Sequence, residues 1–399
     1  MFAFLPVSFD ASMTTLESSQ VRPPWWRDEA TLKIVLQSAF LAATGVAFLW
    51  LIRNMLTGLD KAGLSLGFNF LQNTAGFGIS EGIKYNPTNS YAKALVVGVV
   101  NTIWVSFFGV ILASALGMTL GVARLSSNWL ARQLSKIATE IFRNIPILLI
   151  IIFWYEAVLL PLPKVKESYS FLNAFFLSQR GIYFPSLTAS IWLIPAVLAI
   201  VLAAWGTHFL LKDRGGLPPG LVPLLGLIGA LVVAIGFWAF SPTAPLALDV
   251  PTETNFGYRG GWQFSAEFLA LLLGLVTYTG AYIGEIIRGA FMAVPKGQVE
   301  ASRALGLSEL ETFRLVLVPQ ALRIAIPPMN TQFATLIKNS TLAIAIGYSD
   351  LFNIGGTIIN QSGRSVEVFA IIMSSYLILN LSVSYGMNWF NERVKLVER

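Results

Sequence analysis

Polar side chains inside long apolar stretches are the residues of this sequence best placed to do chemistry. Lys338 lies within the apolar stretch 324–346, and Asn330 and Thr341 lie near its side of a helix, at spacings of eight and three. A charge at the centre of a membrane helix costs about 2.5–3.5 kcal/mol on insertion scales. Lys338 must therefore face protein or water, where its ammonium group could bind an anionic group of a solute.

A second polar face is predicted on the stretch 262–287. Tyr278, Tyr282 and Glu285 recur there at i, i+4 and i+7, so they share one side of a helix. In a structural interpretation, Lys338 pairs with Glu285 or binds carbonyl groups at a broken helix. The complete set of candidates for a solute path is Lys338, Asn339, Ser340, Thr341, Asn330, Tyr278, Tyr282, Glu285, Asn101 and Thr102, of which the last two can equally join neighbouring helices.

The composition excludes several kinds of catalytic centre. The 399 residues contain no cysteine and one histidine, His208, so thiolate metal sites, disulfides and most histidine chemistry are ruled out. We predict no metal site, and we interpret His208 as a surface residue. The net charge of +6 does not indicate nucleic-acid binding. The phosphate loop Gly-x-x-x-x-Gly-Lys-[Ser/Thr] is absent from the sequence, so any ATP that drives this protein binds to another polypeptide.

The segment 288–323 carries another informative pattern, a short helix that ends at a glycine. Pro295 suits the first turn of this helix, and Gly306 is placed to end it with a positive φ angle. Ala301 and Ala304 give the helix a face of small side chains, which suits docking in a groove of another protein.

A second helix is predicted directly after this glycine. Ser308 and Glu311 have the spacing of a capping box, with Phe313 and Leu315 as the first apolar positions of the helix. The segment is therefore predicted as a cytosolic helix, a tight turn and a helix that returns to the membrane.

The elements that must position these residues are membrane helices. The chain is 55% hydrophobic and 12% charged, whereas soluble domains have about 25% charged residues. A helix needs about 20 apolar residues to cross a bilayer. Eight segments qualify: 34–52, 94–123, 137–160, 185–205, 220–241, 262–287, 324–346 and 366–390.

The distribution of basic residues predicts the orientation of these spans. With the amino terminus inside, the inner segments hold 16 Lys and Arg in 105 residues, and the outer segments hold 9 in 104. This positive-inside bias places both termini in the cytoplasm. Within the second span, Gly109, Ala113, Gly117 and Gly121 recur every four residues, which allows close helix packing either within one subunit or between subunits.

The order of the motifs resembles that of ABC importer permeases. Glu300-Ala301-Ser302, Gly306 and the pair Val318-Pro319 match the EAA signature of that family, although Ser302 replaces the second alanine and Val318 the usual leucine. Segments similar to the polar amino-acid (histidine/glutamine type) permeases are EIFRNIP (140–146), AYIGEIIRG (281–289), GQ (297–298), PQALR (319–323), PP (327–328) and KNSTL (338–342). The length and the last nine residues resemble the first permease of general L-amino-acid importers.

The resemblance implies an all-α, type I permease with a five-helix core and three extra helices. The expected organisation is an amino-terminal tail, extra helix and periplasmic loop (1–93), an ABC transmembrane domain (94–390) with an insert (161–261), and a cytoplasmic tail (391–399). The resemblance also implies import of polar or general L-amino acids across the bacterial inner membrane. The expected partners are a second permease, two ATPase subunits that bind ATP and Mg, and a periplasmic amino-acid-binding protein.

The resemblance further assigns a role to the loop around residues 300–306. ATPase coupling is expected through Glu300, Ala301, Ser302, Ala304, Leu305 and Gly306. Two other classes are possible on the sequence. A secondary transporter predicts inverted repeats and carboxylates at broken helices, and no convincing repeat is found. A membrane-embedded enzyme needs a convergent catalytic cluster, for which this composition offers few residues.

Overall fold

The computed structural model describes residues 28–61, 63, 66–190, 192–212, 221–254 and 257–394, to which the following statements refer. The predicted amino-terminal tail before residue 28 and most of the carboxy-terminal tail lie outside them. The chain forms two units, 1–67 and 68–399. The first contains one long apolar helix, α1 (Glu29–Lys61), which is long enough to cross a membrane.

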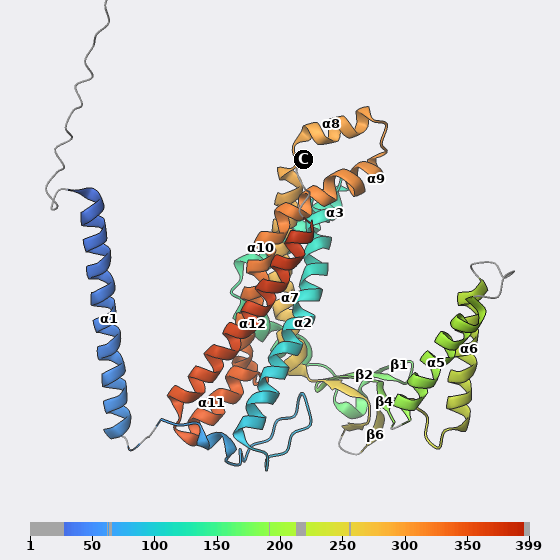
Figure 1. The fold of residues 1–399 in the computed structure, drawn as a ribbon, viewed down its shortest axis with the longest axis horizontal. Coiled ribbons are helices and arrows are strands. Elements are labelled where there is room, and N and C mark those ends of the chain that lie inside the picture. Colours follow the sequence, from blue (N-terminus) through green and yellow to red (C-terminus); the bar gives the residue numbers. More distant parts are fainter. Residues whose placement is uncertain are drawn as a thin grey trace, which may run out of the picture. The chain divides into compact units, whose positions relative to one another are not determined.

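The centre of the second unit is the pair of helices α2 (Tyr91–Ala123) and α7 (Ala266–Ala293) (Figure 1). They pack closely because glycines face each other. A Cβ atom on Gly117 would lie 2.9 Å from the carbonyl oxygen of Gly280, and one on Gly121 would lie 2.8 Å from that of Gly284. The small residues of α2 therefore serve packing within this subunit, which was one of the two interpretations left open by the sequence.

Five helices are long and apolar enough to span a membrane, and the number rises to seven if each of two bent helix pairs counts as one span. The one predicted span outside these seven, 185–205, corresponds to α5, whose apolar part, Leu193–Thr207, is shorter. Besides α1, α2 and α7, the helices are α3 (Trp129–Asn144), α4 (Ile147–Ile152), the π-helical η2 (Phe153–Leu159), α5 (Leu193–Lys212), α6 (Leu221–Phe240), α8 (Lys296–Ala304), α9 (Glu309–Glu311), the π-helical η4 (Thr312–Leu317), α10 (Val318–Asn339), α11 (Leu351–Ser362) and α12 (Ser365–Val394). Three 3-10 turns accompany them: η1 (Asn69–Gln72), η3 (Val165–Glu167) and η5 (Ser340–Ile346).

The prediction of one continuous span over 137–160 is wrong. The chain bends by 110° between α3 and α4–η2. Ile145 ends α3 in an extended conformation, with φ −96° and ψ 132°, and Pro146 follows it. A proline disfavours the helical conformation in the residue before it and lacks the N–H that a helix interior needs, so the helix ends there.

The predicted span 185–205 begins too early, because its first residues form a strand. The insert contains small antiparallel sheets: one of four strands in the order β1-β2-β3-β8, and two hairpins, β4-β5 and β6-β7. The predicted start of the span 262–287 is also shifted, because β8 precedes α7. Strand β8 pairs with β3 and is therefore counted with the insert below, although it lies beyond residue 261. The strands are β1 (Tyr169–Phe171), β2 (Phe175–Ser178), β3 (Gly181–Phe184), β4 (Ser186–Ala189), β5 (Leu246–Asp249), β6 (Thr252–Thr254), β7 (Gly257–Arg259) and β8 (Trp262–Phe264).

The two helices that flank the predicted cytosolic segment 288–323 extend into it from both sides. Helix α7 continues to Ala293, and α10 already begins at Val318. Pro327 and Pro328 lie inside α10, and the helix tightens into the 3-10 segment η5 after Asn339. The predicted span 324–346 is therefore a helix whose geometry changes after Asn339, one residue beyond Lys338.

Candidate functional site

The loop between α7 and α10 forms a compact hairpin at one end of the helical unit. Helices α8 and α9 project there beyond the ends of α2 and α7 (Figure 1). Pro295 occupies the N-cap of α8, one position before the predicted first turn. Gly306 follows the end of α8 with φ +79°. Its N–H donates to the carbonyl of Arg303 at 3.0 Å, and Leu307 N–H donates to that of Ser302 at 3.1 Å. This pair of bonds is a Schellman motif, which favours glycine at the left-handed position.

The second half of the hairpin begins with the predicted capping box. Ser308 accepts a hydrogen bond from Glu311 N–H at 3.3 Å, and the Glu311 carboxylate accepts one from Ser308 N–H at 2.9 Å. The Ser308 hydroxyl, which donates to the Glu311 carboxylate at 2.7 Å, and the Ser308 N–H together hold the pKa of Glu311 below its usual value. Stacking of Phe291 on Phe313, with ring centroids 5.4 Å apart, fixes η4 against the end of α7. Local hydrogen bonds therefore fix both the end of α8 and the start of α9.

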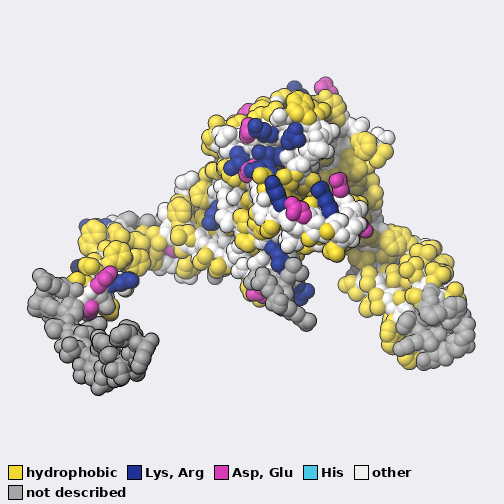
Figure 2. All heavy atoms as spheres, turned by 90° about the horizontal axis from the view of Figure 1, so that it is seen from above, with side chains coloured by type: hydrophobic (Ala, Val, Ile, Leu, Met, Phe, Trp, Pro, Cys, Tyr) yellow, Lys and Arg dark blue, Asp and Glu magenta, His cyan; other side chains and the backbone are white. Residues whose placement is uncertain are grey.

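The outer surface of this hairpin carries the residues expected to contact an ATPase. Glu300, Ala301, Ala304 and Leu305 are exposed, and Leu305 is 81% exposed although it is a large apolar residue. An exposed apolar side chain beside small residues suits a protein contact. Ser302 differs from this group because it is buried. Figure 2, which looks onto this end of the helical unit, shows Lys and Arg side chains gathered over it.

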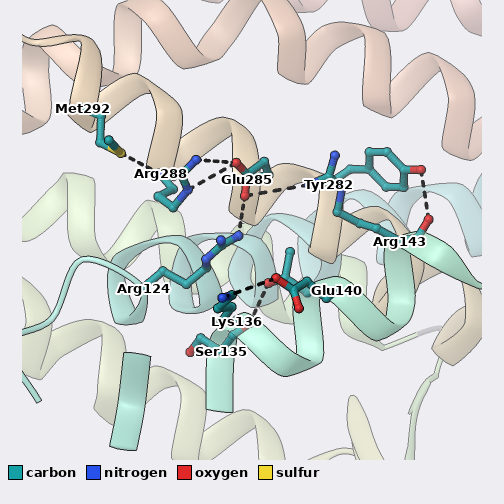
Figure 3. A network of polar contacts seen from close by, with 10 residues as sticks. Arg124, Ser135, Lys136, Glu140, Arg143, Tyr282, Glu285, Arg288 and Met292 are labelled. Carbon is teal, nitrogen blue, oxygen red and sulfur yellow. Dashed lines mark hydrogen bonds and ion pairs between the residues drawn. The ribbon is translucent and has the colours of Figure 1, made fainter. Parts of the chain in front are cut away.

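An ionic cluster lies close to the ends of α2, α3 and α7 (Figure 3). The carboxylate of Glu285 contacts the guanidinium of Arg124, lies 2.6 Å from Arg288 Nη2 and lies 3.8 Å from Arg143 Nη1. The interpretation that Glu285 pairs with Lys338 is therefore wrong, since its ion-pair partners in the described part of the chain are arginines. One carboxylate among three guanidinium groups leaves this cluster with a formal excess of positive charge.

The two tyrosines on the same face of α7 belong to this cluster. The hydroxyl of Tyr282 lies 3.4 Å from the backbone carbonyl oxygen of Arg143, whose guanidinium lies 5.1 Å from the Tyr282 ring centroid. The Tyr278 hydroxyl lies 3.4 Å from that of Tyr282. The structure thus brings Tyr278, Tyr282 and Glu285 together, as the spacing predicts. It adds Arg143, which belongs to the family-like segment 140–146.

The candidates on α10 and η5 are divided between two faces. Lys338 is exposed, in the last turn of α10, where a cation interacts favourably with the helix dipole. Ser340 is buried, and its hydroxyl donates to the carbonyl of Ile337 at 2.8 Å. Thr341 donates to the carbonyl of Lys338 at 2.8 Å. Asn330 and Asn339 are half-buried. The structure therefore leaves Lys338 accessible from outside this chain, while Ser340 faces its interior.

Asn101 and Thr102 lie on α2 and bind the backbone that precedes α11. Asn101 Nδ2 donates to the carbonyl of Ser349 at 2.8 Å, and Thr102 Oγ1 accepts from Leu351 N–H at 3.1 Å. Both side chains are buried, and their hydrogen bonds join α2 to the start of α11. Asn101 also contributes to the wall of a cavity at the end of α7 remote from α8, which the sequence patterns did not indicate. Within the described residues, no group of three His, Asp or Glu side chains is placed to hold a metal ion.

Comparisons with known proteins connect these features to one family. A profile of the family described as "binding-protein-dependent transport system inner membrane component" matches residues 109–396. The YhdX protein of Escherichia coli (strain K12), whose name places it provisionally among amino-acid ABC transporter permeases, is 42% identical, with 90% of this chain and 93% of that protein covered.

Two further relatives carry more specific names. The general L-amino acid transport system permease protein AapQ of Rhizobium johnstonii is 41% identical over 88% of this chain and 89% of its own length. The glutamate/glutamine/aspartate/asparagine transport system permease protein BztB of Rhodobacter capsulatus is 36% identical, over 92% and 94%. A crystal structure of an amino acid ABC transporter with histidines superposes with a TM-score of 0.46 and 19% identity, covering 76% of this chain and 95% of the other.

Proposed function

Because the chain belongs to the family of binding-protein-dependent transport system inner membrane components, we propose that it is the subunit through which an ATP-driven importer moves L-amino acids. The family match over residues 109–396 carries this conclusion. The resemblance to ABC importer permeases is thereby confirmed, and a secondary transporter is not favoured. The names of AapQ and BztB support L-amino acids as the substrate class.

The hairpin α8–α9 is the proposed contact with the ATPase subunits. Its small and apolar exposed residues, Ala301, Ala304 and Leu305, offer a surface for a partner. The Schellman motif at Gly306 and the capping box at Ser308 hold the two halves at a fixed angle. A rigid hairpin can transmit a displacement to α7 and α10, which directly precede and follow it.

The remaining parts of the proposed assembly are those expected of a binding-protein-dependent importer. The importer combines this chain with two ATPase subunits that bind ATP and Mg and with a periplasmic binding protein. A second, different permease completes the membrane part as a heterodimer. The chain spans the inner membrane with both termini in the cytoplasm, an orientation supported by the excess of Lys and Arg in the inner segments.

The test is uptake of labelled L-amino acids into proteoliposomes that contain this chain, co-expressed with the products of its neighbouring genes. We expect uptake to require both ATP inside and a soluble binding protein outside. Uptake that proceeds without ATP, driven by an ion gradient, would contradict the proposal and favour a secondary transporter. The matched control is the same complex with an ATPase subunit that binds ATP but does not hydrolyse it.

A further inference from the structure

A cavity of about 790 Å³ lies at the end of α7 that is remote from the α8–α9 hairpin. Helix α7 has 28 residues, so about 42 Å separates the two ends. The cavity is formed by the loop before α2, by α2, by the first turn of α7 and by two parts of the insert, which are the turn between β2 and β3 and the strand β8. Volumes of 300–1,000 Å³ are typical of small-molecule sites.

Two carboxylates line this cavity. Glu81, from the loop before α2, accepts a hydrogen bond from Ser349 N–H at 3.3 Å. Glu267, from the first turn of α7, accepts one from the Tyr155 hydroxyl at 3.0 Å. Burial raises the pKa of Glu81, and repulsion from the Glu267 carboxylate raises it further. Because both acids line the same cavity, a cationic group bound near both of them would be stabilised.

The cavity is also lined by one arginine and two tryptophans. The arginine and one tryptophan come from the insert, and the other tryptophan lies on α2. Arg180 lies in the turn between β2 and β3. Trp262 on β8 packs edge-on against Trp104 on α2, with ring centroids 6.2 Å apart. With Glu81 and Glu267, the arginine gives a lining with both signs of charge and a formal net charge of −1. A purely anionic ligand is disfavoured there, whereas a zwitterion can satisfy both signs.

The wall beneath these groups is held by buried hydrogen bonds. Asn101 is 1% exposed, and its Nδ2 donates to the carbonyl of Ser349, whose N–H binds Glu81. The hydroxyl of Tyr348 donates to the backbone carbonyl of Asn101 at 3.1 Å. Because its neighbours are fixed in this way, the Glu81 carboxylate is positioned before any ligand arrives. Preorganisation of this kind reduces the entropy cost of binding.

We propose that this cavity binds a zwitterionic amino acid at the outer end of the permease. The α-ammonium group lies between the carboxylates of Glu81 and Glu267, and the α-carboxylate lies toward Arg180. The side chain of the ligand packs against Trp104 and Trp262. The insert thereby gains a function, because it supplies Arg180 and Trp262 to a site that the helical core alone would leave incomplete. This inference rests on the proposed function for its choice of ligand and for calling this end the outer one.

The experiment is equilibrium binding of radiolabelled L-glutamine to the purified permease–ATPase complex in lipid nanodiscs, without binding protein. We expect saturable binding that is weakened at least tenfold by Glu81→Gln, by Glu267→Gln and by Arg180→Gln. Glu167→Gln and Arg259→Gln are the matched controls, because both residues are exposed on the insert and neither lines the cavity. These two controls are expected to bind as the unmodified complex does.

Competition by two analogues tests each charge separately. Glutaramate lacks the α-ammonium group of glutamine, and 4-aminobutanamide lacks its α-carboxylate. Both are expected to compete at least tenfold less well than L-glutamine. Equal competition by glutaramate would overturn the assignment to the acidic pair, and equal competition by 4-aminobutanamide would overturn that to Arg180. Absence of saturable binding, or unchanged affinity in Glu267→Gln and Arg180→Gln, would overturn the site as a whole.

ATP-dependent uptake by the same preparations separates this inference from the proposed function. Uptake by the unmodified complex, together with normal binding in the cavity variants, refutes only the cavity site. Saturable binding without ATP-driven uptake supports the cavity and refutes the proposed transport mechanism. Basal ATPase activity and elution as a single complex show that each variant is folded, so a loss of binding reports on the cavity.

Discussion

The side-chain oxygens of Ser302 and Thr312 lie 3.0 Å apart and join α8 to η4 across the turn of the cytosolic hairpin. Both residues are buried, and Ser302 also donates to the carbonyl of Val299 at 2.8 Å. The serine occupies the position where the EAA signature usually has its second alanine. It is therefore a contact within the hairpin, whereas its exposed neighbours are available to a partner.

The effect of substituting Ser302 on coupling is expected to depend strongly on the size of the new side chain. Ser302→Ala removes a hydrogen bond and leaves Thr312 without that partner, which costs about 1 kcal/mol, so coupling should persist. Ser302→Leu overpacks the buried joint at a cost of about 1–3 kcal/mol and displaces α8 from η4. The measurement is the ratio of amino-acid uptake to ATP hydrolysis in proteoliposomes. A normal ratio in Ser302→Leu would mean that the angle between α8 and η4 does not matter for coupling.

Gly306→Val is expected to uncouple ATP hydrolysis from uptake while leaving assembly close to normal. The backbone there has φ +79°, which costs a residue with a Cβ atom about 1–2 kcal/mol, and more for a β-branched one. Space is not the reason, because a Cβ atom on Gly306 would meet nothing within 4 Å. The hairpin must therefore change its turn to accommodate valine.

Two control variants make this test specific to the backbone conformation. Gly297→Ala adds a Cβ atom within α8, also with nothing within 4 Å, and should leave coupling unchanged. The coupling of Gly306→Asn should lie between that of Gly306→Val and that of Gly297→Ala, because asparagine tolerates the left-handed conformation. Binding-protein-stimulated ATPase activity and uptake are measured on the same samples. Equal coupling in Gly306→Val and Gly297→Ala would refute the role of this turn.

The hairpin was predictable because its signals are local. A glycine after a short helix and a serine three residues before a glutamate each specify backbone hydrogen bonds within a few residues, and both predictions are confirmed. The bend at Ile145–Pro146 was also encoded locally, but the apolar character of 137–160 outweighed the proline in the prediction. Hydropathy reports the solvent around a segment and not the direction of its axis.

The cavity was not predictable by the same means, because its lining comes from segments far apart in the sequence. Glu81 and Glu267 are nearly two hundred residues apart, and neither lies in a motif. Arg180 and Trp262 reach the same cavity because β3 pairs with β8, although residues 182–184 and 262–264 are about eighty positions apart in the sequence. The short strands of the insert carried too little alternation to predict that pairing. A charged residue in a loop was therefore indistinguishable from a solvated one.

Glu285→Gln is expected to destabilise the permease, because it leaves Arg124, Arg143 and Arg288 without their shared carboxylate. Hydrogen bonds to charged groups contribute about 1.5–3 kcal/mol each, and partial exposure of this cluster reduces the loss toward the lower figure. The melting temperature of the purified complex measures the effect. Glu140→Gln is the matched control, because its pair with Lys136 is 3.9 Å long and more than half exposed, worth at most about 0.5 kcal/mol.

The outcome of this comparison also decides what the cluster does. A lower melting temperature with a normal ratio of uptake to ATP hydrolysis indicates a structural joint between α2, α3 and α7. Normal stability with impaired uptake indicates that Glu285 acts in the solute path, as the sequence pattern allowed. Equal behaviour of Glu285→Gln and Glu140→Gln would contradict both roles.

Lys338→Met tests whether the exposed lysine on α10 binds solute. If its ammonium group binds the substrate carboxylate, uptake should fall at least tenfold, and Lys338→Arg should retain part of it because the charge remains. Lys166→Met, outside the membrane helices, is the control for loss of a positive charge. Normal uptake by Lys338→Met would remove the residue from the solute path. It would favour the structural alternative, in which the lysine stabilises the last turn of α10 through the helix dipole, an interaction worth about 0.3–1 kcal/mol and measurable as a small fall in melting temperature.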